Sequence, residues 1–262
     1  MSVYVVSDLH GAAEDLQAAV PPGSALVLLG DLINFLDYIS MTGILTEVFD
    51  LGDVEHVVKL RTEGNVAEAR AVMRDRAKGR ESEIQSEIGR RVFEQYASVF
   101  EALPDPTYLI LGNVDNPPLA YDFAERHPNV HLVDGSVVTI EEERFGFAGG
   151  ALPTPMGVAG EITEEEMSSK LQGLGPCDVL CTHIPPAVPE LCYDTVAGKS
   201  EKGSEDILRY IEEHQPRMAY FGHVHQPLVS SMHIGRTWCV NVGYFRATKR
   251  AFPHPPATDS IS

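Results

Sequence analysis

Short apolar runs recur along the chain and are separated by polar or helical segments. VYVVS at 3–7 and ALVLL at 25–29 are rich in Val and Leu, which is typical of strands buried on both faces. AAEDLQAAV at 12–20 predicts a short helix between them. Further strands are predicted at 108–112, 130–133, 137–140, 144–150, 178–183, 218–223, 228–232 and 237–243, and further helices around 164–174 and 204–213. This alternation predicts a layered α/β fold.

Residues 35–103 break the alternation and predict nearly continuous helix. Apolar side chains recur at helical spacing there, among them Ile88, Val92, Tyr96 and Val99. We interpret the segment as a helical insertion within one domain spanning 1–262, and expect it either to cover a site or to form a homodimer contact. The Pro-rich, polar tail at 251–262 is expected to be flexible.

The amino-acid composition and the net charge disfavour some classes of function. The formal net charge is −18 and the pI is near 4.8, which disfavours binding to a nucleic-acid backbone, because such proteins carry clustered Lys and Arg. Basic residues at 59–91 alternate with acidic ones and predict a solvated helix face. No apolar run approaches the roughly 20 residues that span a bilayer, so no membrane contact is expected.

The N-terminal residues and the cysteines predict the compartment. MSVYVVSDLH lacks the basic and apolar regions of a secretory signal. The four cysteines contain no C-x-x-C pair and are expected to be reduced thiols. Together these features predict a cytoplasmic protein.

Side chains that can bind a metal ion follow five of the predicted strands. The segments are SDLH at 7–10, GDLIN at 30–34, GNVDN at 112–116, THIPP at 182–186 and GHVH at 222–225. Sites in open α/β sheets form beyond the carboxyl ends of strands, so these segments are expected to converge. Alternation along an extended segment would point the paired residues of D-x-H and H-x-H the same way. Each motif alone is weak, since a polar residue after a strand is more often a turn or a helix cap.

In this order, the five segments resemble the calcineurin-like metallophosphoesterase superfamily. Its pattern is D-x-H, GD, GNH followed by Asp or Glu, a lone His, and G-H-x-H. The resemblance runs from about Val3 to Val242, omits the insertion, and implies a four-layer α/β/β/α sandwich of two mixed sheets. It implies that one metal takes Asp8, His10 and His225, that the other takes Asn113, His183 and His223, and that Asp31 bridges both. Two divalent ions are expected, and the mixed ligands suit Mn, Fe, Zn or Co.

The resemblance also implies a mechanism. A hydroxide bridging the metals would be the nucleophile, so no side chain is assigned as catalytic. The sequence departs from the pattern at Val114, where the superfamily commonly has a His that protonates the leaving group. Asp115, the next residue, either caps a turn or has no assigned role. Asn34 is either a substrate contact or a helix cap, and Arg246 is the nearest candidate for a phosphate contact.

These features favour a phosphodiesterase that acts on a small-molecule phosphoester. Superfamily members that lack the GNH histidine include active phosphodiesterases. A phosphomonoesterase, including a protein phosphatase, is the second hypothesis. It ranks lower, because such enzymes usually rely on the His that is missing here and on Arg residues near the phosphate. A non-catalytic metal-binding scaffold of the same fold is the third. No recognition code in the sequence indicates the substrate.

Overall fold

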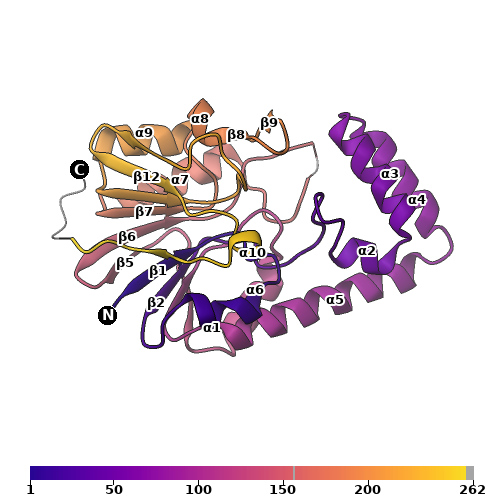
Figure 1. Cartoon of the computed structure of the whole chain (residues 1–262), viewed down its shortest axis with the longest axis horizontal. Coiled ribbons are helices and arrows are strands. Elements are labelled where there is room, and N and C mark those ends of the chain that lie inside the picture. Colours follow the sequence, from indigo (N-terminus) through magenta and orange to yellow (C-terminus); the bar gives the residue numbers. More distant parts are fainter. Residues whose placement is uncertain (156, 258–262) are drawn as a thin grey trace.

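The computed structural model describes residues 1–155 and 157–257, and two mixed sheets form its body (Figure 1). The first sheet has the order β13 (Phe252–Pro253), β1 (Val3–Val6), β2 (Ala25–Leu28), β3 (Thr107–Leu109) and β4 (Val130–Leu132), and all but β13 are parallel. The second has the order β11 (Ser231–Ile234), β12 (Thr237–Asn241), β10 (Met218–Phe221), β7 (Val179–Thr182), β6 (Glu143–Ala148) and β5 (Val137–Ile140). A small hairpin joins β8 (Tyr193–Asp194) and β9 (Lys199–Ser200).

Helices lie on the outer faces of both sheets, which confirms the predicted four-layer sandwich. In chain order, the α-helices of the described residues are α1 (Leu16–Ala19), α2 (Ile44–Val48), α3 (Leu51–Thr62), α4 (Val66–Ala77), α5 (Glu81–Ala102), α6 (Pro117–Ala124), α7 (Glu164–Leu174), α8 (Pro189–Cys192), α9 (Glu205–His214) and α10 (Phe245–Thr248). A capping box between Thr163 and Glu166 begins α7, and the Ser204 side chain caps α9. Polar side chains at these starts supply partners for backbone N–H groups that the first turn of a helix leaves free.

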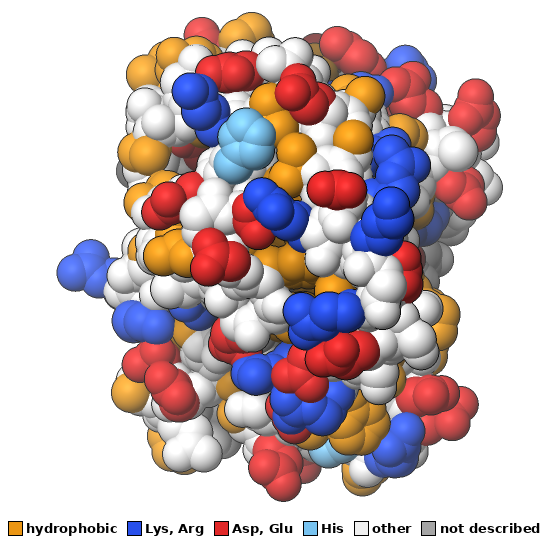
Figure 2. Space-filling view, turned by 90° about the vertical axis from the view of Figure 1, so that its right-hand side faces the viewer, with side chains coloured by type: hydrophobic (Ala, Val, Ile, Leu, Met, Phe, Trp, Pro, Cys, Tyr) orange, Lys and Arg blue, Asp and Glu red, His pale blue; other side chains and the backbone are white. Residues whose placement is uncertain are grey.

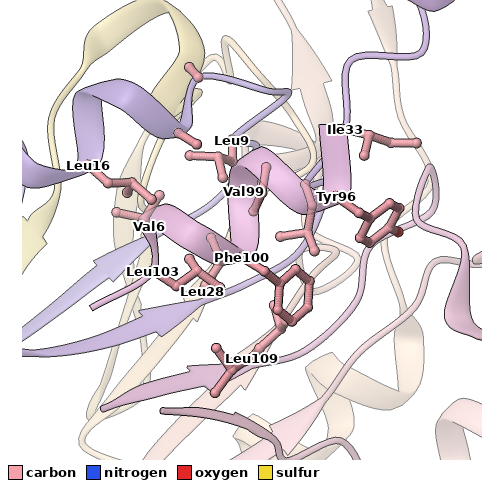
Figure 3. Packing of buried hydrophobic residues seen from close by; sticks show 14 of the residues in the cluster. Val6, Leu9, Leu16, Leu28, Ile33, Tyr96, Val99, Phe100, Leu103 and Leu109 are labelled. Carbon is pink, nitrogen blue, oxygen red and sulfur yellow. The ribbon is translucent and has the colours of Figure 1, made fainter. Parts of the chain in front are cut away.

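The strand sequences do not alternate between apolar and polar residues, because three apolar layers cover both faces of the sheets. Along β2, Leu26 and Leu28 pack against helices, whereas Val27 faces the space between the two sheets. Successive side chains of a strand point to opposite faces, and here both faces are buried. Figure 3 shows the helix-side layer, where Tyr96 and Phe100 of α5 approach the first sheet.

The segment 35–103 contains α2 to α5 between β2 and β3. Helix α5 runs along the outer face of the first sheet, whereas α3 and α4 pack against each other and extend away from the body (Figure 1). The predicted helix from Leu36 to Gly43 is wrong. The Asp37 side chain accepts the backbone N–H groups of Ile39 and Ser40, and this local bonding competes with a helix.

The prediction of a flexible tail from residue 251 is wrong for its first residues. Phe252–Pro253 pair antiparallel with β1. The His254 ring contacts the hydroxyl of Tyr220 at 2.8 Å and a carboxylate oxygen of Glu143 at 2.9 Å. The sequence carries no local signal for these contacts, because both partners lie more than thirty positions away. Residues 258–262 lie outside the described part of the chain. Among the described residues, no helix is long and apolar enough to span a bilayer.

Candidate metal centre

The predicted side chains converge at the carboxyl ends of β1, β2, β3, β7 and β10 and form two groups. The first group is Asp8, His10 and His225, and the second is Asp31, His183 and His223. Within each group, one potential ligand atom per residue lies within 4.8 Å of the others. The first group contains the three residues that the resemblance gives to one metal. The second contains His183 and His223, which the resemblance gives to the other metal, together with Asp31, the expected bridge.

Asp31 lies between the two groups. Its Oδ2 atom is 3.6 Å from Nε2 of His10, in the first group. Its Oδ1 atom is 3.5 Å from Nε2 of His183, in the second. Each oxygen of one carboxylate therefore faces a different set of ligands, which is the arrangement that a bridging ligand of two ions requires.

Backbone carbonyls orient two of the imidazoles. Nδ1 of His10 lies 3.0 Å from the carbonyl oxygen of Ile33, and Nδ1 of His183 lies 2.8 Å from that of Leu29. A carbonyl only accepts, so Nδ1 carries the proton and Nε2 presents a lone pair toward the centre. Nε2 of His10 lies 3.3 Å from Nε2 of His225, so one cation bound there would contact both nitrogens.

Asn113 joins the second group. Its Oδ1 atom is 3.0 Å from Nε2 of His183 and 2.9 Å from Nδ1 of His223. The amide thus adds a neutral oxygen donor to a group that already contains one carboxylate. Its loop, GNVDN, ends β3 and leads into α6, which the Asn116 side chain caps by accepting the Leu119 N–H.

Left-handed backbone at the ligands corrects the expectation of extended D-x-H and H-x-H segments. The φ angles are +54° at Asp8, +42° at His10, +56° at Asp31 and +64° at His223. Non-glycine residues rarely adopt these angles, and they cluster at functional sites. The side chains of these four residues converge because the chain turns sharply after β1, β2 and β10.

Two glycines allow this close packing. A Cβ at Gly112 would lie 2.2 Å from Oδ1 of Asp31, and one at Gly222 would lie 2.3 Å from Oδ2 of Asp8. Both distances are far below van der Waals contact, so only glycine fits at these two positions.

Three buried carboxyl groups, none of them paired with Lys or Arg among the described residues, set the charge of the candidate metal centre. Asp8 and Asp115 are 0% exposed and Asp31 is 3% exposed. No Lys or Arg in the described part of the chain forms an ion pair with any of them. Oδ1 of Asp8 is buried, and its neighbours are imidazoles, with Nε2 of His225 at 3.4 Å and Nε2 of His10 at 3.9 Å. Buried carboxylate oxygens that face imidazoles rather than Lys or Arg fit a site for divalent cations.

The pKa values follow from this burial. Burial raises the pKa of Asp31 to about 7, against an opposing contribution from His183. Burial also lowers the pKa of His10 to about 4 and that of His223 to about 3, which keeps both imidazoles neutral and able to bind metal. At Asp8, burial is outweighed by the hydrogen bond and charge of His225, so the pKa lies below its ordinary value. The reciprocal contact with Asp8 outweighs burial at His225 and raises its pKa.

Several neighbours act differently from what the sequence indicates. Arg246 donates from Nη1 to the carbonyl oxygen of His10 at 2.7 Å and from Nη2 to Oγ1 of Thr42 at 3.2 Å, so it braces two loops. The Asn34 side chain caps none of the described helices, but its carbonyl accepts the N–H of Ile44 at the start of α2 at 3.1 Å. Its backbone N–H donates to the Gln95 side chain at 2.7 Å. Asp115, which the sequence left unassigned or as a turn cap, accepts three backbone N–H groups.

Sequence reasoning missed Tyr244. Its ring stacks on the His225 imidazole, with centroids 3.9 Å apart and planes 6° apart. Its hydroxyl donates to Oδ2 of Asp37 at 3.1 Å, which fixes the ring. No metal-binding motif includes an aromatic residue at this place, so the sequence offered no signal for it.

Comparisons with known proteins identify relatives of the fold and the family of the chain. One crystal structure is 17% identical, with a TM-score of 0.58 and coverage of 93% of this chain and 91% of that chain. TT1561 of Thermus thermophilus is 15% identical, with a TM-score of 0.50 and coverage of 97% of each chain. At these identities the likeness shows a shared fold. No curated protein matches the sequence. A family model described as calcineurin-like phosphoesterase matches residues 1–227, and the chain therefore belongs to the calcineurin-like phosphoesterase family.

Proposed function

We propose that the protein is a dinuclear metal-dependent phosphoesterase that hydrolyses a small-molecule phosphodiester. The position of Asp31 carries the proposal, because its two carboxylate oxygens face the two separate ligand groups at 3.6 and 3.5 Å. The seven ligands would be Asp8, His10, Asp31, Asn113, His183, His223 and His225. Mn, Fe, Zn or Co would suit these mixed oxygen and nitrogen donors.

Each part of the centre has a separate task. Two divalent ions bound there would supply an activated water and would neutralise charge on the phosphoryl oxygens. The carboxylate of Asp31 would hold both ions at one separation. The carbonyls of Ile33 and Leu29 would keep the rings of His10 and His183 aimed inward. The left-handed turns would fix these groups before substrate arrives.

Val114 supports a preference for diesters. Its side chain is partly buried and packs against the apolar layer beneath α5, so position 114 offers no proton to a leaving group. Leaving groups that need little protonation would therefore react best. A phosphomonoester carries more charge and usually relies on a nearby Arg, yet the guanidinium of Arg246 is bonded to His10 and Thr42.

Surface charge supports a small substrate rather than a nucleic acid. Figure 2 shows one face of the molecule, on which basic and acidic side chains are interspersed. Basic and acidic side chains of the inserted segment also pair with each other, as Arg76 does with Asp53 at 2.9 Å. Nucleic-acid binding sites instead segregate basic side chains into a patch or stripe.

Hydrolysis of bis-p-nitrophenyl phosphate and p-nitrophenyl phosphate with Mn²⁺ tests the proposal. We expect faster turnover of the diester and loss of turnover in Asp31→Asn. Glu143→Gln is the matched control, because it also converts a buried carboxylate to an amide, but at the opposite end of its sheet, where it pairs with Arg217. Faster turnover of the monoester would favour a phosphomonoesterase. Metal binding without turnover of any phosphoester would favour a non-catalytic scaffold.

A further inference from the structure

One buried carboxylate joins two of the ligand loops. Oδ2 of Asp115 accepts the backbone N–H of Asp31 at 2.9 Å and that of Gly112 at 2.8 Å. Oδ1 accepts the N–H of Leu32 at 2.9 Å. Three N–H groups from the ends of β2 and β3 therefore converge on a single side chain, which fixes the separation of the loops that carry Asp31 and Asn113.

A tyrosine of the inserted segment completes this junction. The hydroxyl of Tyr96 donates to Oδ1 of Asp115 at 3.3 Å and accepts the backbone N–H of Asn116 at 2.7 Å. Tyr96 is 0% exposed, and its ring packs between Phe100 and Phe123, 5.9 Å from the latter. Figure 3 shows Tyr96 and Phe100 on α5. The packed ring leaves the hydroxyl little freedom, so it acts as a fixed point for the GNVDN loop.

The residue before Tyr96 contacts a second ligand loop. Oε1 of Gln95 accepts the N–H of Asn34 at 2.7 Å, and Nε2 donates to the Asn34 carbonyl at 3.4 Å. Two consecutive side chains of α5 thus reach the loops that follow β2 and β3. Helix α5 is joined to the metal-ligand loops through polar side chains as well as through its apolar face.

The two loops pack too closely to move independently. Gly112 has no room for a Cβ beside Oδ1 of Asp31, and the N–H of Val114 donates to that same oxygen at 3.1 Å. A change in loop separation would therefore be transmitted directly to the Asp31 carboxylate. Groups that orient metal ligands without touching the metal typically contribute about 10–100-fold to metal affinity.

We propose that Tyr96 and Asp115 are positioning residues through which helix α5 sets the relative placement of Asp31 and Asn113. The inference rests on the proposed function, because it assumes that these two residues bind metal. It gives α5 of the inserted segment a role in building the metal centre, in addition to its packing on the first sheet.

Titration of the full-length, metal-free protein with Co²⁺ tests this role. Tyr96→Phe removes only the hydroxyl and keeps the buried ring. We expect its Kd for Co²⁺ to rise about 10-fold or more, with altered visible absorption bands, because those bands report ligand geometry. Tyr210→Phe is the control, since its buried hydroxyl on α9 donates to the Gly175 carbonyl at 2.5 Å, away from the ligand loops. It should lower Tm but leave the Kd and the absorption spectrum unchanged.

The outcomes separate the inference from the proposed function. If Tyr96→Phe lowers Tm as Tyr210→Phe does and binds Co²⁺ with unchanged Kd and spectrum, the hydroxyl is only structural and the inference is overturned. If the unmodified protein binds no Co²⁺, the proposed function fails and the inference fails with it. Asp115→Asn places an amide NH₂ among N–H donors, and a Kd raised further than in Tyr96→Phe would support the inference.

Discussion

The backbone N–H of Val114 donates to Oδ1 of Asp31 at 3.1 Å. Position 114 therefore reaches the candidate metal centre through its main chain, while its side chain packs against the apolar layer. A substitution there changes the side chain and leaves the hydrogen bond to Asp31 in place. The effect of a proton donor at position 114 can therefore be tested while the hydrogen bond to Asp31 is kept.

Val114→His is expected to favour substrates with poor leaving groups. General acid catalysis contributes typically about 10²–10⁴-fold, and an imidazole at this position would supply it mainly where protonation is needed. The measurement is the ratio of turnover of diphenyl phosphate to that of bis-p-nitrophenyl phosphate, with Val114→Ala as control. The ratio should rise in the His variant alone. Equal ratios in both variants would show that no proton donor is needed at position 114.

Tyr244→Leu is expected to weaken metal binding, because it removes the ring that stacks on His225 at 3.9 Å. The expected loss is about 10-fold in Mn²⁺ affinity, as for other groups that orient a ligand. Tyr244→Phe keeps the stacked ring and loses only the bond to Asp37, so it should bind nearly as tightly as the unmodified protein. Calorimetric titration with Mn²⁺ measures both. Equal affinities of the Leu and Phe variants would refute a role for stacking.

Gly112→Ala is expected to destabilise the fold and abolish metal binding. The new Cβ would lie 2.2 Å from Oδ1 of Asp31 and 2.6 Å from Cε1 of His183, and overpacking of this kind costs about 1–3 kcal/mol or more. Gly173→Ala on α7 is the control, because nothing lies within 4 Å of its Cβ position. A helical Gly→Ala change should stabilise by about 0.5–1 kcal/mol. Urea unfolding followed by Mn²⁺ titration measures both effects, and metal binding by Gly112→Ala would contradict the close packing.

Metal affinity is expected to rise with pH through about 7. Burial raises the pKa of Asp31 to about 7 in the metal-free protein, and the pKa of His225 is also raised, because its contact with Asp8 outweighs burial. Both groups hold protons at pH 6, and metal must displace them. Affinity therefore falls as pH drops through this range and levels off once the two groups have deprotonated. His10 and His223, with pKa values lowered to about 4 and 3, remain neutral throughout.

Calorimetry in two buffers that differ in ionisation enthalpy counts the released protons. We expect more protons released per Mn²⁺ bound at pH 6 than at pH 8.5. Glu143→Gln should show the same difference, because its carboxylate lies at the other end of the sheet. An equal count at both pH values would contradict the raised pKa of Asp31.

Sequence pattern alone predicts the layered fold and the donor residues of the candidate metal centre. Buried strands need continuous runs such as VYVV, and a metal centre needs particular donor atoms, so residue types at strand ends carry the information. The division of the ligands into two groups was available through the resemblance. These features are local in sequence, and each can be identified one segment at a time.

The neighbours that support those donor residues become visible in the folded chain. Asp115 meets Asp31 across 84 positions and Tyr96 across 19. Tyr244 belongs to no motif, and Phe252–Pro253 form a strand where the sequence predicts a flexible tail. Hydrogen bonds and ring stacking between distant segments depend on how the layers pack. A one-dimensional pattern therefore specifies the donor atoms of this protein, whereas the folded chain specifies what holds them in place.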